Sequence, residues 1–313
     1  MTRALVFPGQ GSQAVGMGRE LAEAFAPARQ VFEEVDEALK QNLSRLMFEG
    51  PEADLTLTEN AQPALMAVSL AIVRTLEREG GLDLARHVSF VAGHSLGEYS
   101  ALAAVGAFSL ADTARLLRTR GRAMQEAVPV GVGAMAALLG LDLDGARAAA
   151  AEAAQGEVCD AANDNAPGQV VVSGHKSAVE RAVAIAKTKG AKRAMLLPVS
   201  APFHCALMAP AAEVMVKALA DVQMHAPKVP VVANVTAGPI GEIGDIRRRL
   251  AEQVTGMVRW RESIEFLKGS DVTQAAELGA GKVLAGLGKR TAPEIAFTSV
   301  GVPADVEGFL KAL

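Results

Sequence analysis

Ser89-Phe90-Val91-Ala92-Gly93-His94-Ser95-Leu96-Gly97-Glu98-Tyr99-Ser100-Ala101-Leu102-Ala103-Ala104 is the stretch that indicates the fold of this chain. Its apolar first part predicts a short buried strand, and its last part predicts a helix. Between them, residues 93–97 fit the pattern G-x-S-x-G, which forms a nucleophile elbow when it joins a strand to a helix. We therefore predict that Ser95 is a nucleophile, and that the backbone N–H of Leu96 faces an oxyanion formed there. The alternative is an ordinary glycine-rich turn with a capping serine.

The composition predicts a globular protein of the cytoplasm. Half of the 313 residues are hydrophobic, and the formal net charge of −4 argues against nucleic acid as the main partner. The two cysteines, Cys159 and Cys205, are too few for a disulfide framework. The longest uncharged apolar stretch, residues 127–141, is shorter than the roughly 20 residues that a membrane span needs. We also expect no signal peptide. No metal site is expected either, because no set of His, Cys, Asp and Glu residues has metal-ligand spacing.

The order of the predicted elements indicates an α/β protein with two parts. Residues 129–198 read as strand, helix, strand, strand, helix, strand, which is the ferredoxin-like βαββαβ unit. We expect this small subdomain to be inserted into a large α/β-hydrolase-like domain, residues 1–128 and 199–313, built on a parallel sheet. The seam between two such bodies is a favoured place for a binding cleft.

A second loop is predicted to lie beside Ser95. Residues 4–7 predict a strand, and the loop Pro8-Gly9-Gln10-Gly11-Ser12-Gln13 follows it. The loop is not a dinucleotide fingerprint, because no acidic residue follows a second strand at the expected spacing. The carboxyl ends of parallel strands meet at one edge of the sheet, so both turns are expected to open there. Two helices are predicted next, over residues 21–40 and from Pro63, as a first-turn proline, to residue 79.

An arginine and a histidine complete the candidate site. Arg120 lies on the apolar side of a predicted helix, where an arginine usually has a carboxylate partner from the protein or from a substrate. Ser95 needs a base, and His204 is the best candidate of five histidines, because it lies in a proline-flanked apolar segment. The residues alone indicate no acid to complete a triad. Cys205 is expected to be a buried thiol and not the nucleophile.

Several blocks of the sequence together resemble one enzyme family. The blocks are Phe7-Pro8-Gly9-Gln10-Gly11-Ser12-Gln13, Gly93-His94-Ser95-Leu96-Gly97-Glu98-Tyr99, Arg120-Gly121-Arg122-Ala123-Met124-Gln125, Pro198-Val199-Ser200-Ala201-Pro202-Phe203-His204, and Gln253 followed by Val258-Arg259-Trp260. In order and spacing they resemble the malonyl-CoA:acyl carrier protein transacylases of bacterial fatty acid synthesis.

The resemblance implies a ping-pong transfer of a malonyl group from coenzyme A to the phosphopantetheine thiol of acyl carrier protein. It implies that Ser95 forms a malonyl ester, with His204 as general base. The backbone N–H groups of Gln10 and Leu96 would hold the oxyanion. In this family a backbone carbonyl orients the histidine, here that of Gln253, and no aspartate is needed. No cofactor is implied, and a monomer is expected.

Two side chains are implied to select the acyl group. Arg120 would pair with the free malonyl carboxylate and so discriminate against acetyl groups. Many bacterial members have a small residue where Phe203 stands. A phenylalanine there resembles the malonyl-selecting acyltransferase domains of modular polyketide synthases, and we expect it to exclude an α-methyl group. The alternatives are a stand-alone polyketide acyltransferase, a serine thioesterase or esterase, and a non-catalytic scaffold.

Overall fold

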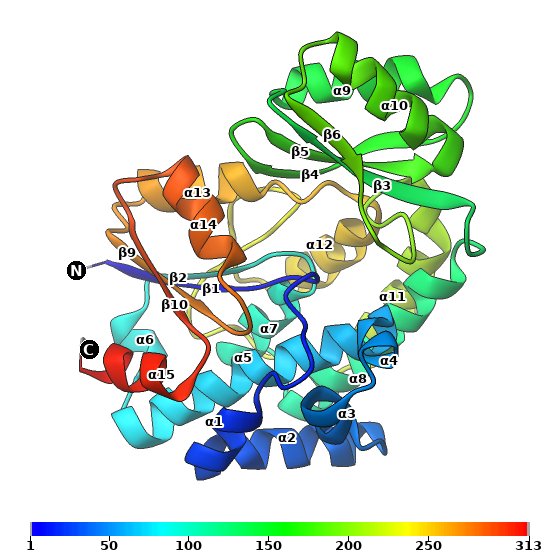
Figure 1. Ribbon diagram of the computed structural model, residues 1–313. Coiled ribbons are helices and arrows are strands. Elements are labelled where there is room, and N and C mark those ends of the chain that lie inside the picture. Colours follow the sequence, from blue (N-terminus) through cyan, green and yellow to red (C-terminus); the bar gives the residue numbers. More distant parts are fainter. Residues whose placement is uncertain (1, 312–313) are drawn as a thin grey trace.

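A six-stranded sheet forms the centre of the larger part of the computed structural model, which describes residues 2–311 (Figure 1). In spatial order its strands are β10 (Ala296–Val300), β9 (Gln274–Leu278), β1 (Arg3–Phe7), β2 (Phe90–Gly93), β7 (Val231–Val232) and β8 (Pro239–Ile240). All neighbouring pairs are parallel except β7 and β8, which are antiparallel. The predicted α/β fold with a parallel sheet is therefore confirmed.

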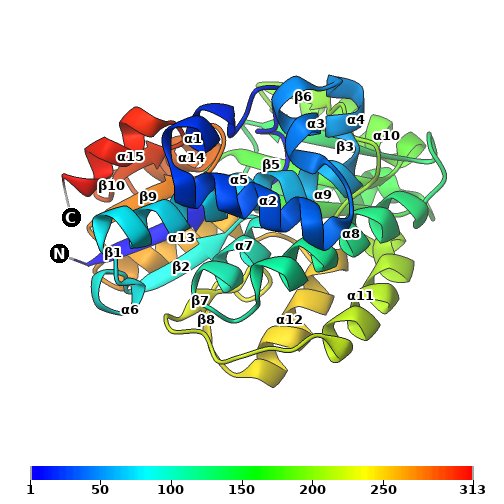
Figure 2. The ribbon, with the colours of Figure 1, turned by 90° about the horizontal axis from the view of Figure 1, so that it is seen from below.

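The two faces of this sheet are covered by different helices, because side chains alternate along each strand. Leu5 and Phe7 of β1 face one apolar cluster, whereas Ala4 and Val6 face another. On the first face, α5 (Thr58–Gly80) packs against α2 (Ala26–Leu39) and α8 (Leu110–Glu126), which also contact each other (Figure 2). On the second face lie α13 (Trp260–Gly269) and α14 (Val283–Thr291). The remaining helices are α1 (Arg19–Ala24), α3 (Leu43–Glu49), α4 (Glu52–Thr56), α6 (Leu84–His87), α7 (Gly97–Ala104), the short 3₁₀ helix η1 (Ala206–Met208), α11 (Ala209–Asp221), α12 (Ile243–Thr255) and α15 (Pro303–Leu310).

A second, antiparallel sheet lies above the first in Figure 1. Its spatial order is β4 (Cys159–Ala166), β5 (Gln169–His175), β3 (Gly133–Leu139), β6 (Arg193–Leu196). In the chain α9 (Leu143–Ala154) lies between β3 and β4, and α10 (Lys176–Thr188) lies between β5 and β6. Alanines of both helices share a separate apolar cluster with the sheet. The element order is that expected from the sequence, and the division into domains at residues 128 and 198 stays a prediction.

Two helix predictions were wrong, one in its interior and one at its start. The expected helix over residues 21–40 is broken at Phe25, which is extended, because Pro27 in the first turn of α2 has no N–H to continue the hydrogen bonds of α1. The second helix begins at Thr58, so Pro63 lies inside α5 and not in its first turn. The first turns of α5 carry buried polar side chains that hide the apolar period, among them Gln62.

The elbow after β2 is packed so closely that only glycine fits on either side of the serine. Ser95 has a φ of 54°, in the left-handed region that L-residues rarely adopt. A Cβ atom on Gly97 would lie 2.2 Å from the carbonyl oxygen of Phe7, at the end of β1. One on Gly93 would lie 1.9 Å from the carbonyl oxygen of Gly97. The ends of two neighbouring strands therefore hold Ser95 at the edge of the sheet.

This close approach predicts a large difference between two glycine-to-alanine substitutions. Gly97→Ala forces backbone atoms apart, and we expect it to lower the free energy of unfolding by about 3 kcal/mol. Gly286→Ala, inside α14, meets no atom within 4 Å and removes a poor helix former, so it should raise that free energy by about 0.5–1 kcal/mol. Urea unfolding followed by circular dichroism measures both, and equal effects would contradict the packing argument.

Candidate active site

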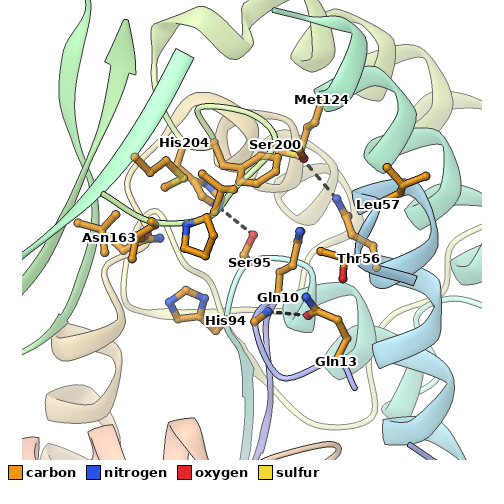
Figure 3. Close-up of a pocket in the computed structure, with 18 of the residues that line it drawn as sticks. Gln10, Gln13, Thr56, Leu57, His94, Ser95, Met124, Asn163, Ser200 and His204 are labelled. Carbon is orange, nitrogen blue, oxygen red and sulfur yellow. Dashed lines mark hydrogen bonds between the residues drawn. The ribbon is translucent and has the colours of Figure 1, made fainter. Parts of the chain in front are cut away.

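A cavity of about 840 Å³ lies between the two sheets, at the carboxyl ends of β1 and β2. Gln10, from the loop after β1, and Ser95, from the elbow after β2, both line it. His204, from the segment that returns after β6, lies on the opposite side, and its ring points toward Ser95 (Figure 3). The two predicted turns therefore do meet at one edge of the sheet.

Ser95 and His204 form a hydrogen-bonded pair. Ser95 Oγ lies 2.8 Å from His204 Nε2. On the other side of the ring, Nδ1 lies 2.8 Å from the carbonyl oxygen of Gln253 and 3.2 Å from that of Gly256. Carbonyl oxygens only accept hydrogen bonds, so Nδ1 carries the proton and Nε2 is free to accept the proton of the serine hydroxyl. The geometry is that of a nucleophile and its base, with a backbone carbonyl in the place of a triad acid.

The histidine is held in its neutral form. It is 3 % exposed, and burial, aided by the positive charge of Arg120, lowers the pKa of His204 to about 3. Accepting carbonyls at Nδ1 oppose this shift without cancelling it. At neutral pH the imidazole is therefore uncharged and can act as a base.

Arg120 contributes a buried positive charge directly beside the nucleophile. Its side chain is 1 % exposed, and its guanidinium donates to Gln62 Oε1 at 2.8 Å, to Gln253 Oε1 at 2.8 Å and to Ser95 Oγ at 3.1 Å. Among residues 2–311, no carboxylate oxygen lies within 4 Å of it. The cation is thus surrounded by neutral acceptors in a cavity, and an anionic ligand group could replace one of them.

The other residues predicted for the site have different surroundings. Phe203 is buried and lines the cavity beside His204. Gln10 lines it as well, and its side chain accepts a hydrogen bond from Thr58. Leu96 is the N-cap residue of α7, behind Ser95. Within the described part of the chain, the structure shows no hydrogen bond to the backbone N–H of Gln10 or of Leu96.

Three polar residues of the site were not singled out from the sequence. Gln62 accepts a hydrogen bond from Arg120. Asn234 accepts from the backbone N–H of Ser95 at 2.7 Å, and Glu98 accepts from the side chain of Gln253 at 2.7 Å. Glu98 is recognisable as a polar residue in an apolar helical pattern, whereas Gln62 precedes the helix predicted from Pro63 and has no such signal.

Comparison with known proteins identifies the family. Residues 4–258 match the model of the acyl transferase domain. The chain belongs to the acyl transferase family. It is 44% identical to the malonyl CoA-acyl carrier protein transacylase of Escherichia coli (strain K12), over 98% of each chain. It is 45% identical to the Bacillus subtilis (strain 168) enzyme of the same name, over 99% of this chain and 96% of that one. The family resemblance seen in the sequence is thereby confirmed.

Solved structures of this family have the same fold. The acyl-carrier-protein S-malonyltransferase of Bartonella henselae superposes with a TM-score of 0.97 at 55% identity, over 100% of this chain and 99% of that one. A malonyl-transacylase in complex with its type II polyketide synthase acyl-carrier protein has a TM-score of 0.97 at 43% identity, with both chains fully covered. In the described part of this acyl transferase, no helix has the length and apolarity to cross a membrane.

The lowered pKa of His204 predicts how this acyl transferase responds to pH. A fluorophosphonate probe reacts with an activated serine, so its rate of Ser95 labelling reports the base form of the histidine. We expect this rate to stay within about twofold between pH 8 and pH 5.5, because the neutral imidazole persists well below the usual pKa of about 6.5. Labelling is followed by intact mass. A rate that falls with a midpoint near pH 6.5 would show that the histidine is not held neutral.

Proposed function

We propose that this protein transfers a malonyl group from coenzyme A to the phosphopantetheine thiol of acyl carrier protein, for fatty acid synthesis. The observation that carries the proposal is the buried guanidinium of Arg120, which lies 3.1 Å from Ser95 Oγ and has no carboxylate within ion-pair distance among residues 2–311. A serine hydrolase needs only the nucleophile and the base. An arginine beside them fits an acyl group that carries its own carboxylate, as malonyl does. The names of the relatives agree with this reading.

The reaction starts when Ser95 Oγ attacks the thioester carbonyl and its proton passes to His204 Nε2. Two backbone N–H groups, of Gln10 and Leu96, would hold the oxyanion that forms. The imidazolium then protonates the leaving thiolate of coenzyme A, which leaves a malonyl ester on the serine. His204 next takes the proton from the carrier thiol as its sulfur attacks the ester, and returns it to Oγ. Each step moves an acyl group and a proton, so no further cofactor is required.

The environment of Arg120 explains why the acyl group would be malonyl. A guanidinium and a carboxylate form two parallel hydrogen bonds, and removing one partner of such a buried pair costs several kcal/mol. An acetyl group would leave the cation unpaired.

One chain supplies the nucleophile, the base and the arginine of the cavity, which are Ser95, His204 and Arg120. Cys159 and Cys205 are both free and buried. We accordingly propose a monomer that works in the cytoplasm.

Intact-mass measurement tests this function directly. The protein is mixed with malonyl-CoA alone, and carrier protein is then added. We expect a malonyl adduct that Ser95→Ala abolishes and that passes to the carrier. Rapid release of free malonate would indicate a thioesterase, and the absence of any adduct would indicate a scaffold. One similar structure contains a polyketide carrier protein, so the experiment supplies both a fatty-acid carrier and a polyketide carrier. Faster transfer to the polyketide carrier would favour the polyketide alternative.

Substitution of Arg120 tests the acyl selectivity. Arg120→Ala should lower kcat/KM for malonyl-CoA about 100-fold, which corresponds to about 3 kcal/mol, and lower that for acetyl-CoA far less. Arg122→Ala is the control, because Arg122 lies on the same helix but is exposed and pairs with Glu59. Steady-state kinetics with both esters measures the ratio. Equal losses for the two esters would exclude a carboxylate-binding role.

Phe203 gives a separate prediction about the α-carbon of the acyl group. Its ring lines the cavity next to His204, where it would fill the space of an α-methyl group. Phe203→Ser should raise the ratio of kcat/KM for methylmalonyl-CoA to that for malonyl-CoA roughly tenfold, as expected for one methyl group in an apolar pocket. Competition between the two esters for limiting carrier protein measures this ratio. An unchanged ratio would remove Phe203 from the specificity determinants.

A further inference from the structure

Glu98 is a buried carboxyl group that the proposed reaction does not use. It is the second residue of α7, three positions after Ser95, and its side chain is 0 % exposed. Burial raises the pKa of Glu98 to about 7, although hydrogen bonds from Gln253 and Asn234 and the charge of Arg120 act in the opposite direction. A fully buried carboxyl beside an active site needs a physical explanation.

The contacts of Glu98 fix two amides that touch the reacting groups. Its Oε2 accepts from Gln253 Nε2 at 2.7 Å and from the backbone N–H of Asn234 at 3.1 Å. Because the amide nitrogen of Gln253 faces this carboxyl, its Oε1 faces Arg120. Glu98 thus determines the orientation in which Gln253 accepts from the arginine, while the backbone oxygen of the same residue accepts from His204.

Glu98 is also a carboxyl that partly offsets the charge of Arg120 from beyond ion-pair distance. The two groups are linked through one side chain, Gln253, and each influences the pKa of the other. The groups packed around Glu98 from other elements are the Arg120 guanidinium of α8, the neutral amide of Gln253 in α12 and Asn234 after β7. Its neighbour Tyr99 has a pKa raised by burial and stays uncharged. Among residues 2–311, the cation of Arg120 is therefore the charge that stabilises ionised Glu98.

We propose that Glu98 is a positioning residue for Arg120, and that it takes up a proton from solvent when a malonyl carboxylate binds to the arginine. A bound carboxylate would pair with the guanidinium and remove the charge that keeps Glu98 ionised. Two carboxylates would then share one buried cation, which is unfavourable at low dielectric. Protonation at Oε1, which has no partner in the described structure, relieves this and leaves both hydrogen bonds to Oε2 in place.

The inference rests on the proposed function, and it predicts that malonyl-CoA binding weakens as pH rises. Above pH 7, Glu98 is ionised in the free enzyme and must be protonated in the complex. Binding therefore takes up a proton, and the affinity falls as the proton concentration falls. In the Ser95→Ala protein, which cannot be acylated, Kd for malonyl-CoA should rise roughly tenfold between pH 6.5 and pH 8.5. With Glu98→Gln added, Kd should be nearly independent of pH, because the neutral amide imitates the protonated acid.

Titration calorimetry in two buffers of different ionisation enthalpy counts the protons. At pH 7.5, Ser95→Ala should take up roughly 0.7 proton per malonyl-CoA bound, and the double variant close to none. Coenzyme A itself is the matched control, since it has the same phosphates but no malonyl carboxylate, and it should cause no such uptake. This comparison needs no change at Glu98, so it decides the question even if Glu98→Gln fails to fold.

The outcomes separate this inference from the proposed function. Malonyl transfer without proton uptake, or uptake that is the same with coenzyme A, overturns the role of Glu98 and leaves the transacylase proposal intact. No malonyl-CoA binding and no transfer overturns the transacylase proposal itself. A purely structural role for Glu98 predicts that Glu98→Gln lowers affinity equally at every pH, and that result would also overturn the inference.

Discussion

The positive charge of Arg120 is buried between the two sheets and has no carboxylate within ion-pair distance in the described structure. Neutral oxygens of Gln62 and Gln253 hold the guanidinium in place, so it stays available to a ligand. The same charge helps keep His204 neutral, which a base requires. One buried cation thus links the selection of the acyl group to the activation of the serine.

Close packing and hydrogen bonds fix the backbone of the site around Ser95. Ser95 adopts a positive φ in a turn where a methyl group on Gly97 would clash with the end of β1 and one on Gly93 would clash with Gly97. Its backbone N–H is held by Asn234, and its backbone oxygen accepts from Gln253. These bonds hold the backbone of the nucleophile in a fixed place beside its base, and such positioning favours a transfer in two steps.

Much of the fold could be predicted from local patterns. The parallel sheet, the βαββαβ order of the smaller sheet and the elbow all follow from apolar runs and glycines close together in sequence. The start of α5 could not be predicted, because the buried polar side chains of its first turns contact the site and do not follow the apolar period of a core helix. Gln62 is one example, since its amide serves Arg120 from an element 58 residues away in the chain.

The sequence by itself determined that Ser95 lies on an elbow, that Arg120 turns toward an apolar face and, through its family resemblance, which reaction to expect. Only the tertiary structure decided what surrounds each of these groups. Three features depend on contacts between distant segments: the 2.8 Å distance from His204 to the serine, the absence of a carboxylate partner for Arg120 among residues 2–311, and the hydrogen bond of buried Glu98 to Gln253. The physical reason is that burial and electrostatic balance are properties of packed surroundings, which no local pattern contains.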